Sequence, residues 1–80
     1  MNQEIFERVK KVIVAQLGEA EISSETTAKD VEGWDSLTHV KIINGVQNEF
    51  NIKFTMSDLR SFSCVGKIVE CVEKKLNSKN

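Results

Sequence analysis

Apolar residues recur at helical spacing in the first segment of the chain. Between residues 3 and 17 they form a single stripe, which consists of Ile5, Phe6, Val9, Val12, Ile13 and Leu17. Repeats at i, i+3, i+4 and i+7 are typical of an amphipathic helix, and Gly18 directly after the stripe is a typical helix stop. The pattern therefore predicts a helix over residues 3–17, with Val14 off the stripe and exposed to solvent.

The next segment, residues 19–34, has no sustained periodicity and is rich in Glu, Ser, Thr and Asp. This predicts a loop of about sixteen residues, which is long for a compact domain and is therefore either functional or tied down. Ile22, Val31 and Trp34 are its expected anchors to the core. Trp34 could also shield a group attached at Ser36.

The helical pattern returns from about Asp35 to Phe50. At 100° per residue one broad apolar arc, with Ile42 at its edge, contains Leu37, Val40, Ile43, Val46 and Phe50. The opposite face, expected to be exposed, contains Thr38, Lys41, Gly45, Asn48 and Glu49. A glycine in the middle of a helix costs about 1 kcal/mol relative to alanine. Gly45 is therefore either tolerated there or allows another backbone to approach.

The last third of the chain predicts a turn at residues 51–53, a core anchor at Phe54 and two further helices. Thr55 or Ser57 can cap a short helical turn that ends near residue 61, with Leu59 facing inward. Ser63 is expected to cap a longer helix, whose apolar stripe is Val65, Ile68, Val69, Val72 and Leu76. The whole pattern predicts one all-α domain over residues 1–80. We expect a four-helix bundle of three longer helices and one short third helix, with a long loop between the first two.

Composition excludes several classes of protein. No apolar run approaches the ~20 residues that a membrane span needs, and the amino terminus does not resemble a signal peptide. We therefore expect a soluble, cytoplasmic protein. We also expect it to be a monomer. Acidic and basic residues are interspersed, the net charge is −1 and no basic stripe is present, which argues against a nucleic-acid partner.

The two cysteines, Cys64 and Cys71, are expected to be structural and unbridged. Seven residues on one helix span ~10.5 Å, beyond the ~7 Å that a disulfide allows between Cα atoms. His39 is the only other soft ligand in the chain, so we expect no metal site.

Candidate chemistry is concentrated at Ser36. A helix that begins at Asp35 or Ser36 places this hydroxyl beside free N–H groups and the positive end of the helix dipole, which suits a phosphate, bound or covalently attached. Both residues are equally typical of a simple N-cap. A serine–base pair of Ser36 with His39 at i+3 is conceivable. No third orienting group is evident, and a histidine at the edge of the core with its polar tip satisfied explains His39 better. The chain suits a carrier better than a catalyst.

The octapeptide Gly33-Trp34-Asp35-Ser36-Leu37-Thr38-His39-Val40, set in this order of helices, resembles the acyl carrier protein family. It is similar in particular to free-standing carriers that have a tryptophan before the Asp-Ser-Leu motif. Residues 7–13, 48–52 and 63–65 are similar to the family's first helix, the end of its second and the start of its fourth.

The resemblance implies a carrier without enzymatic activity. It implies that a phosphopantetheinyl transferase (holo-ACP synthase) attaches 4′-phosphopantetheine to Ser36, with Asp35 and Leu37 as the flanking motif residues. The arm's thiol would then carry an acyl or aminoacyl group as a thioester. Acyl-activating and acyl-transferring enzymes would recognise mainly the second and third helices. The residues expected to dock them are Thr38, Lys41, Gly45 and Asn48.

In one respect the sequence departs from the family. Carriers of fatty acid synthesis usually have a strongly acidic second helix, whereas here Lys41 is basic and Glu49 is the only acid after Asp35. Fatty acid, polyketide, lipopolysaccharide-related and amino-acid-activating pathways therefore all stay open. The alternative from another class is an unmodified helical module that binds a protein partner through its exposed faces.

Overall fold

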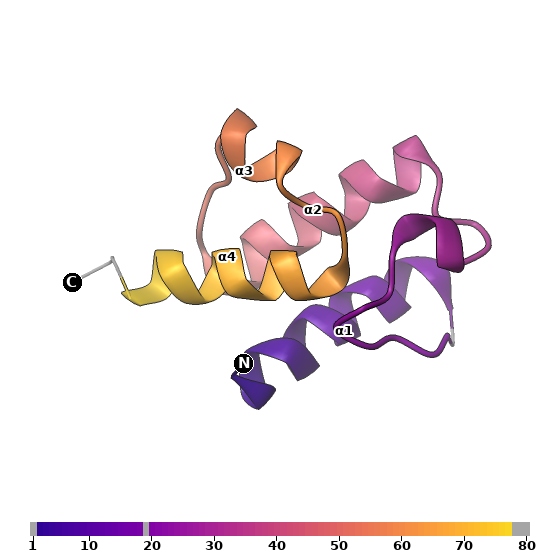
Figure 1. The fold of residues 1–80 in the computed structure, drawn as a ribbon, viewed down its shortest axis with the longest axis horizontal. Coiled ribbons are helices and arrows are strands. Elements are labelled where there is room, and N and C mark those ends of the chain that lie inside the picture. Colours follow the sequence, from indigo (N-terminus) through magenta and orange to yellow (C-terminus); the bar gives the residue numbers. More distant parts are fainter. Residues whose placement is uncertain (1, 19, 78–80) are drawn as a thin grey trace.

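Four α-helices and one 3₁₀ turn follow one another in the computed structural model, which describes residues 2–18 and 20–77. The elements are α1 (Gln3–Leu17), η1 (Ala28–Asp30), α2 (Ser36–Phe50), α3 (Met56–Arg60) and α4 (Val65–Asn77). Figure 1 shows α1 along one side of the molecule, α2 and α4 packed above it, and α3 at the opposite edge. The described residues contain no strand, which confirms the all-α prediction and its short third helix.

The ends of α1 lie where the sequence predicts them. The Asn2 side chain caps its start by accepting a hydrogen bond of 3.1 Å from the backbone N–H of Ile5. Gly18 ends it with φ +83°, a conformation that suits glycine. Val14 is half-buried and packs on the core, so the expectation that it is exposed was wrong. Val14 lines one surface hollow together with Ala20 and Glu21, so the start of the loop lies beside it.

The core is formed by one face of each long helix and by anchors from the loops. α1 contacts both α2 and α4. The fully buried side chains of this core are Val9, Ile13, Ile42, Val46, Val65, Ile68, Val69 and Val72. From the long loop, Ile22 and Trp34 are buried and Val31 packs against the cluster, which confirms the three predicted anchors.

The long loop is also tied to the amino end of α4. The backbone N–H groups of Val65 and Gly66 donate to the carbonyls of Thr26 and Ser24, at 2.8 and 2.7 Å. These two N–H groups have no partner within the helix itself. The prediction that Ser63 caps α4 was therefore wrong, because the loop's carbonyls take that role and α4 begins at Val65.

The apolar arc of α2 is buried only along part of its length. Ile42, Ile43, Val46 and Phe50 are buried, whereas Leu37 and Val40 are 66% and 54% exposed. The expectation that all of the arc faces the core was wrong at these two positions. The first turns of α2 rise away from α1 and α4 (Figure 1), so no neighbouring helix covers them.

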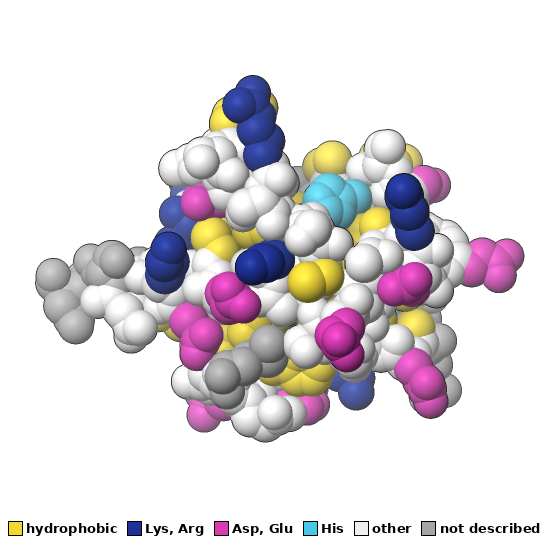
Figure 2. Space-filling model, viewed as in Figure 1, with side chains coloured by type: hydrophobic (Ala, Val, Ile, Leu, Met, Phe, Trp, Pro, Cys, Tyr) yellow, Lys and Arg dark blue, Asp and Glu magenta, His cyan; other side chains and the backbone are white. Residues whose placement is uncertain are grey.

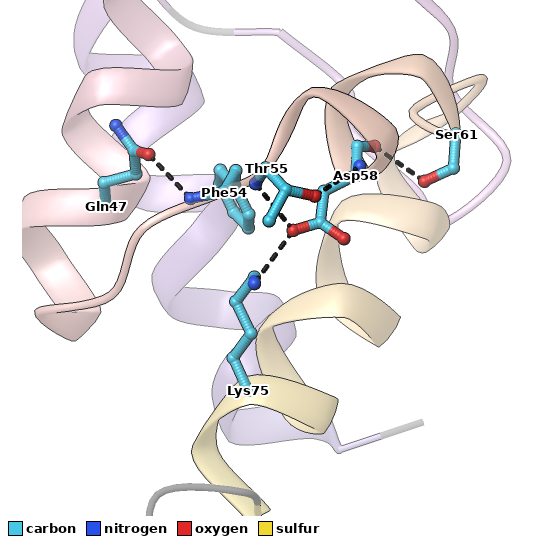
Figure 3. A network of polar contacts seen from close by, with 6 residues as sticks. All are labelled: Gln47, Phe54, Thr55, Asp58, Ser61 and Lys75. Carbon is cyan, nitrogen blue, oxygen red and sulfur yellow. Dashed lines mark hydrogen bonds and ion pairs between the residues drawn. The ribbon is translucent and has the colours of Figure 1, made fainter.

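The short helix α3 contributes no buried residue, and Leu59 is 36% exposed rather than turned inward. Its start is closed by a capping box. The N–H of Thr55 donates to Asp58 Oδ2 at 2.8 Å, and the N–H of Asp58 donates to Thr55 Oγ1 at 3.1 Å. Asp58 also pairs with Lys75 Nζ of α4 at 2.8 Å (Figure 3).

The segment before α3 is held by one further bond. The Gln47 side chain of α2 accepts from the N–H of Phe54 at 2.8 Å (Figure 3). Phe54 is half-buried and meets Phe62 edge-on, with 4.9 Å between ring centroids. Polar contacts and one aromatic pair, rather than core side chains of its own, therefore attach α3 to the bundle.

Candidate functional site

Asp35 and the turn before it fix the start of α2. Gly33 adopts φ +91°, and the N–H of Trp34 donates to the carbonyl of Val31 at 3.3 Å. Asp35 is the N-cap, because its Oδ1 accepts from the N–H of Thr38 at 2.8 Å. Hydrogen bonds from the Thr38 backbone and hydroxyl lower the pKa of the Asp35 carboxyl below its usual value. The predicted cap is therefore Asp35, which leaves the Ser36 hydroxyl without a capping role.

Ser36 is the first residue of α2, and its side chain is exposed. Its hydroxyl makes no hydrogen bond to another group in the described part of the chain. It stands at the positive end of the helix dipole, where an attached phosphodiester is stabilised. A flexible arm joined to Ser36 would meet no obstructing side chain, since Asp35 and Leu37 on either side are also exposed. The position therefore fits a covalently attached phosphopantetheine.

On either side of Ser36 along the chain, Trp34 of the long loop and His39 of α2 are joined by a hydrogen bond. Trp34 is buried, and its indole Nε1–H donates to Nδ1 of His39 at 3.1 Å. The two rings are stacked, with centroids 6.1 Å apart and 29° between their planes. His39 is half-buried, and this burial lowers the pKa of its imidazole. The prediction of a histidine at the edge of the core with a satisfied polar tip is confirmed.

The Trp34–His39 bond excludes a serine–base pair of Ser36 with His39. With Nδ1 accepting from Trp34, neutral His39 carries its proton on Nε2 and presents a donor there rather than a base. The residues described also contain no cluster of three His, Cys, Asp or Glu side chains that could hold a metal ion. Cys64 and Cys71 are both free thiols.

The four residues expected to dock partners do not share one exposed face. Lys41 and Asn48 are exposed, and Thr38 is half-buried. Gly45 instead faces α1, because a Cβ built on it would lie 2.6 Å from Cγ1 of Val12. The placement of Gly45 on the exposed face was therefore wrong. The glycine allows α1 to approach α2 closely, which was one of the two explanations left open.

Two features of the site could not be found from the sequence pattern. The Trp34–His39 bond crosses from loop to helix at a spacing of five residues, which is no helical neighbour distance. The exposure of Leu37 and Val40 depends on which turns of α2 are covered by other helices. On α3, Met56 and Leu59 are exposed as well, at 68% and 36%.

Comparisons with known proteins agree with this geometry. A family model described as a phosphopantetheine attachment site matches residues 7–72. The acyl carrier protein of Thermotoga maritima is 40% identical over 77 residues, which cover 94% of this chain and 95% of that protein. The solution structure of a holo acyl carrier protein from Geobacter metallireducens matches with a TM-score of 0.85 and 27% identity. This match covers 94% of this chain and 88% of the other.

The helical bundle with an exposed serine at the start of its second helix is thus a carrier domain that bears covalent 4′-phosphopantetheine. The chain belongs to the acyl carrier protein family. It is a carrier of acyl groups and not an enzyme. Among the described residues, no helix is both long and apolar enough to cross a membrane.

Proposed function

We propose that Ser36 is the residue to which a phosphopantetheinyl transferase attaches the arm. The observation that carries this proposal is the position of Ser36 as the exposed first residue of α2, directly after the Asp35 cap. The transferase moves the phosphopantetheine of coenzyme A to the serine oxygen, releasing adenosine 3′,5′-bisphosphate and the hydroxyl proton. The chain's own part is to present an unobstructed hydroxyl on a rigid helix end.

The arm then carries an acyl or aminoacyl group as a thioester between partner enzymes. The protein supplies the attachment point and a surface for recognition, and the enzymes supply the chemistry. We place this exchange in the cytoplasm and assign the carrier as a monomer. The relationship to a bacterial acyl carrier protein supports the first assignment.

The surface next to Ser36 is the proposed docking surface for these enzymes, with Leu37, Val40 and Lys41 at its centre and Thr38 and Asn48 beside them. Two exposed apolar side chains that no helix covers support this choice. Apolar anchors surrounded by polar groups are typical of protein interfaces. Gly45 is excluded because it packs against α1.

Charge points to the class of partner. The one acid within α2, Glu49, pairs with Arg8 of α1 at 2.8 Å, while Lys41 is exposed. On α3, Asp58 is paired with Lys75, and basic and hydrophobic side chains project together from this helix (Figure 2). After the exposed Asp35, both acids of α2 and α3 are thus paired with basic residues, and such a surface favours partners with acidic groups. We therefore favour a specialised lipid, lipopolysaccharide-type, polyketide or aminoacyl pathway over general fatty acid synthesis.

Intact-mass spectrometry after incubation with coenzyme A and a promiscuous phosphopantetheinyl transferase tests the attachment site. The parent protein should gain one phosphopantetheine, and Ser36→Ala should gain none while keeping its helical circular dichroism. Ser57→Ala is the matched control, because Ser57 is also exposed in the first turn of a helix, and it should be modified like the parent. Modification of Ser36→Ala would move the site elsewhere. An unmodified parent across several transferases would favour the unmodified interaction module.

A further inference from the structure

The Trp34–His39 bond constrains the protonation of His39. An indole N–H is a donor only, so the bond of 3.1 Å requires an unprotonated Nδ1. Neutral imidazole meets this requirement with its proton on Nε2. An imidazolium has hydrogens on both nitrogens, and its Nδ1–H would face the indole N–H donor to donor. The bond therefore exists only while His39 is neutral.

The bond also brackets the proposed attachment residue. Trp34 is the last residue before the Asp35 cap, and His39 lies in the first turns of α2, with Ser36 between them along the chain. The backbone N–H of His39 donates to the carbonyl of Asp35 at 2.8 Å. His39 is thus bonded through its backbone to the cap and through its ring to the loop anchor.

We propose that His39 is a positioning residue for the modification of Ser36, which holds the buried Trp34 against the start of α2 and releases it when the imidazole is protonated. The proposal rests on Ser36 as the attachment residue. Without the bond, the indole N–H of a residue only 8% exposed loses its partner, and a buried donor without a partner favours an opened loop. An opened loop leaves the segment that leads into Ser36 less ordered when a transferase binds it.

Burial is the main cause of the lowered pKa of His39. Burial lowers the pKa of its imidazole, and no charged side chain of the described elements adds to or offsets that effect. The nearest charged residues along the chain are Asp35, whose carboxylate is bonded to the N–H of Thr38, and the exposed Lys41; Glu32 of the loop is also exposed. Because the folded-state pKa is lowered, the bond contributes fully at pH values above the usual histidine range near 6.5. Its contribution is lost as the pH falls through the lower folded-state value.

The chain offers a direct readout, since it contains one tryptophan and one histidine. Tryptophan emission is recorded from pH 7.5 down to pH 4.5 for the parent, His39→Asn and His39→Phe. Asparagine keeps an acceptor near the position of Nδ1 and does not titrate, whereas phenylalanine keeps a ring and removes the acceptor. The parent should show a one-proton change in emission below pH 6.5, and both variants should lack it.

The same three proteins are then modified by the promiscuous transferase with coenzyme A, and kcat/KM is measured by intact mass. At pH 7.5, His39→Asn should be modified at close to the parent rate. Loss of one hydrogen bond corresponds to about a threefold to tenfold effect, so His39→Phe should be slower by that factor. The ratio of the parent rate to the His39→Asn rate should fall by the same factor towards pH 5. Taking this ratio cancels the pH dependence of the transferase itself, because both rates are measured with the same enzyme.

Several outcomes would overturn the proposal. They are a flat emission of the parent across the range, equal modification of His39→Phe and His39→Asn, or a ratio that does not change with pH. If circular dichroism shows that His39→Phe does not fold, the emission of the parent and the ratio to His39→Asn decide alone. A parent that shows the emission change but is not modified even at pH 7.5 refutes Ser36 as the attachment residue, and with it the positioning role, while the pH-dependent bond stands.

Discussion

The close approach of α1 and α2 at Gly45 allows a prediction whose sign can be worked out from the structure. A Cβ at this position would lie 2.6 Å from Cγ1 of Val12. That is about 1 Å inside the optimal separation of carbon atoms, and overpacking of this kind costs about 1–3 kcal/mol. Replacing a mid-helix glycine by alanine gains back about 1 kcal/mol of helix propensity. Gly45→Ala should therefore lower the free energy of unfolding by up to about 2 kcal/mol.

The partner substitution Val12→Ala should reverse that sign. It removes Cγ1, and the next contact of the new Cβ is with Cβ of residue 12 at 3.9 Å, an ordinary van der Waals distance. In this background the helix-propensity gain is no longer opposed, so Gly45→Ala should stabilise the protein by about 1 kcal/mol. The two backgrounds should then differ by about 1–3 kcal/mol in the effect of the same change.

Urea unfolding of the four proteins, followed by far-ultraviolet circular dichroism, measures this double-mutant cycle. The cost of Val12→Ala alone is one corner of the cycle and cancels from the comparison. Effects that add to within about 0.5 kcal/mol in both backgrounds would refute the reasoning. Gly45 would then be tolerated in α2 without any role in the approach of α1.

Three further predictions concern Lys41 of α2, the ion pair between Asp58 and Lys75, and the two cysteines. Lys41→Glu should slow loading by the native partner enzyme and speed loading by fatty acid synthase enzymes. Both changes in rate should be smaller at high salt, because salt screens the exposed charge. Unchanged rates with both classes of enzyme would place recognition elsewhere on the surface. Hydrogen bonds from Lys75 and from the N–H of Thr55 lower the pKa of Asp58 to about 2, so these contacts stabilise the fold above about pH 4 and their contribution is lost towards pH 2. Lys75→Met should therefore flatten the acid-side loss of stability in unfolding experiments between those pH values; an unchanged slope would contradict this. The double variant Cys64→Ala, Cys71→Ala should still be phosphopantetheinylated and loaded, as mass spectrometry can show, and loss of loading alone would implicate a protein thiol.

The positions of the helices could be read from the sequence because local signals mark their ends. Gly18 ends α1 and Asp35 caps α2, both as predicted, and the structure adds Asn2 as the cap of α1, which was not predicted. The serine at the start of α2 follows from the same local signal.

What the sequence could not supply depends on contacts between distant segments. A helical pattern gives the direction of an apolar face but not the length over which a neighbour covers it, so the pattern wrongly predicts that Leu37 and Val40 are buried. The caps of α4 come from the loop carbonyls of Ser24 and Thr26, which no pattern around residue 63 can indicate. The sequence alone could not show whether Gly45 is merely tolerated or allows another segment to approach α2. That depends on the position of Val12 in α1.

The bonds from Ser24 and Thr26 to the start of α4 have a consequence for the order in which the domain forms. The loop lies in the first half of the chain, and the N–H groups that hold it belong to the last helix. During synthesis from the amino terminus, the loop that leads into Trp34 and Ser36 therefore emerges long before its attachment point. A nascent or truncated chain that lacks α4 contains the complete motif around Ser36 without the tie that orders the loop before it. We therefore expect the proposed modification of Ser36 to depend on the finished domain and not on the motif alone.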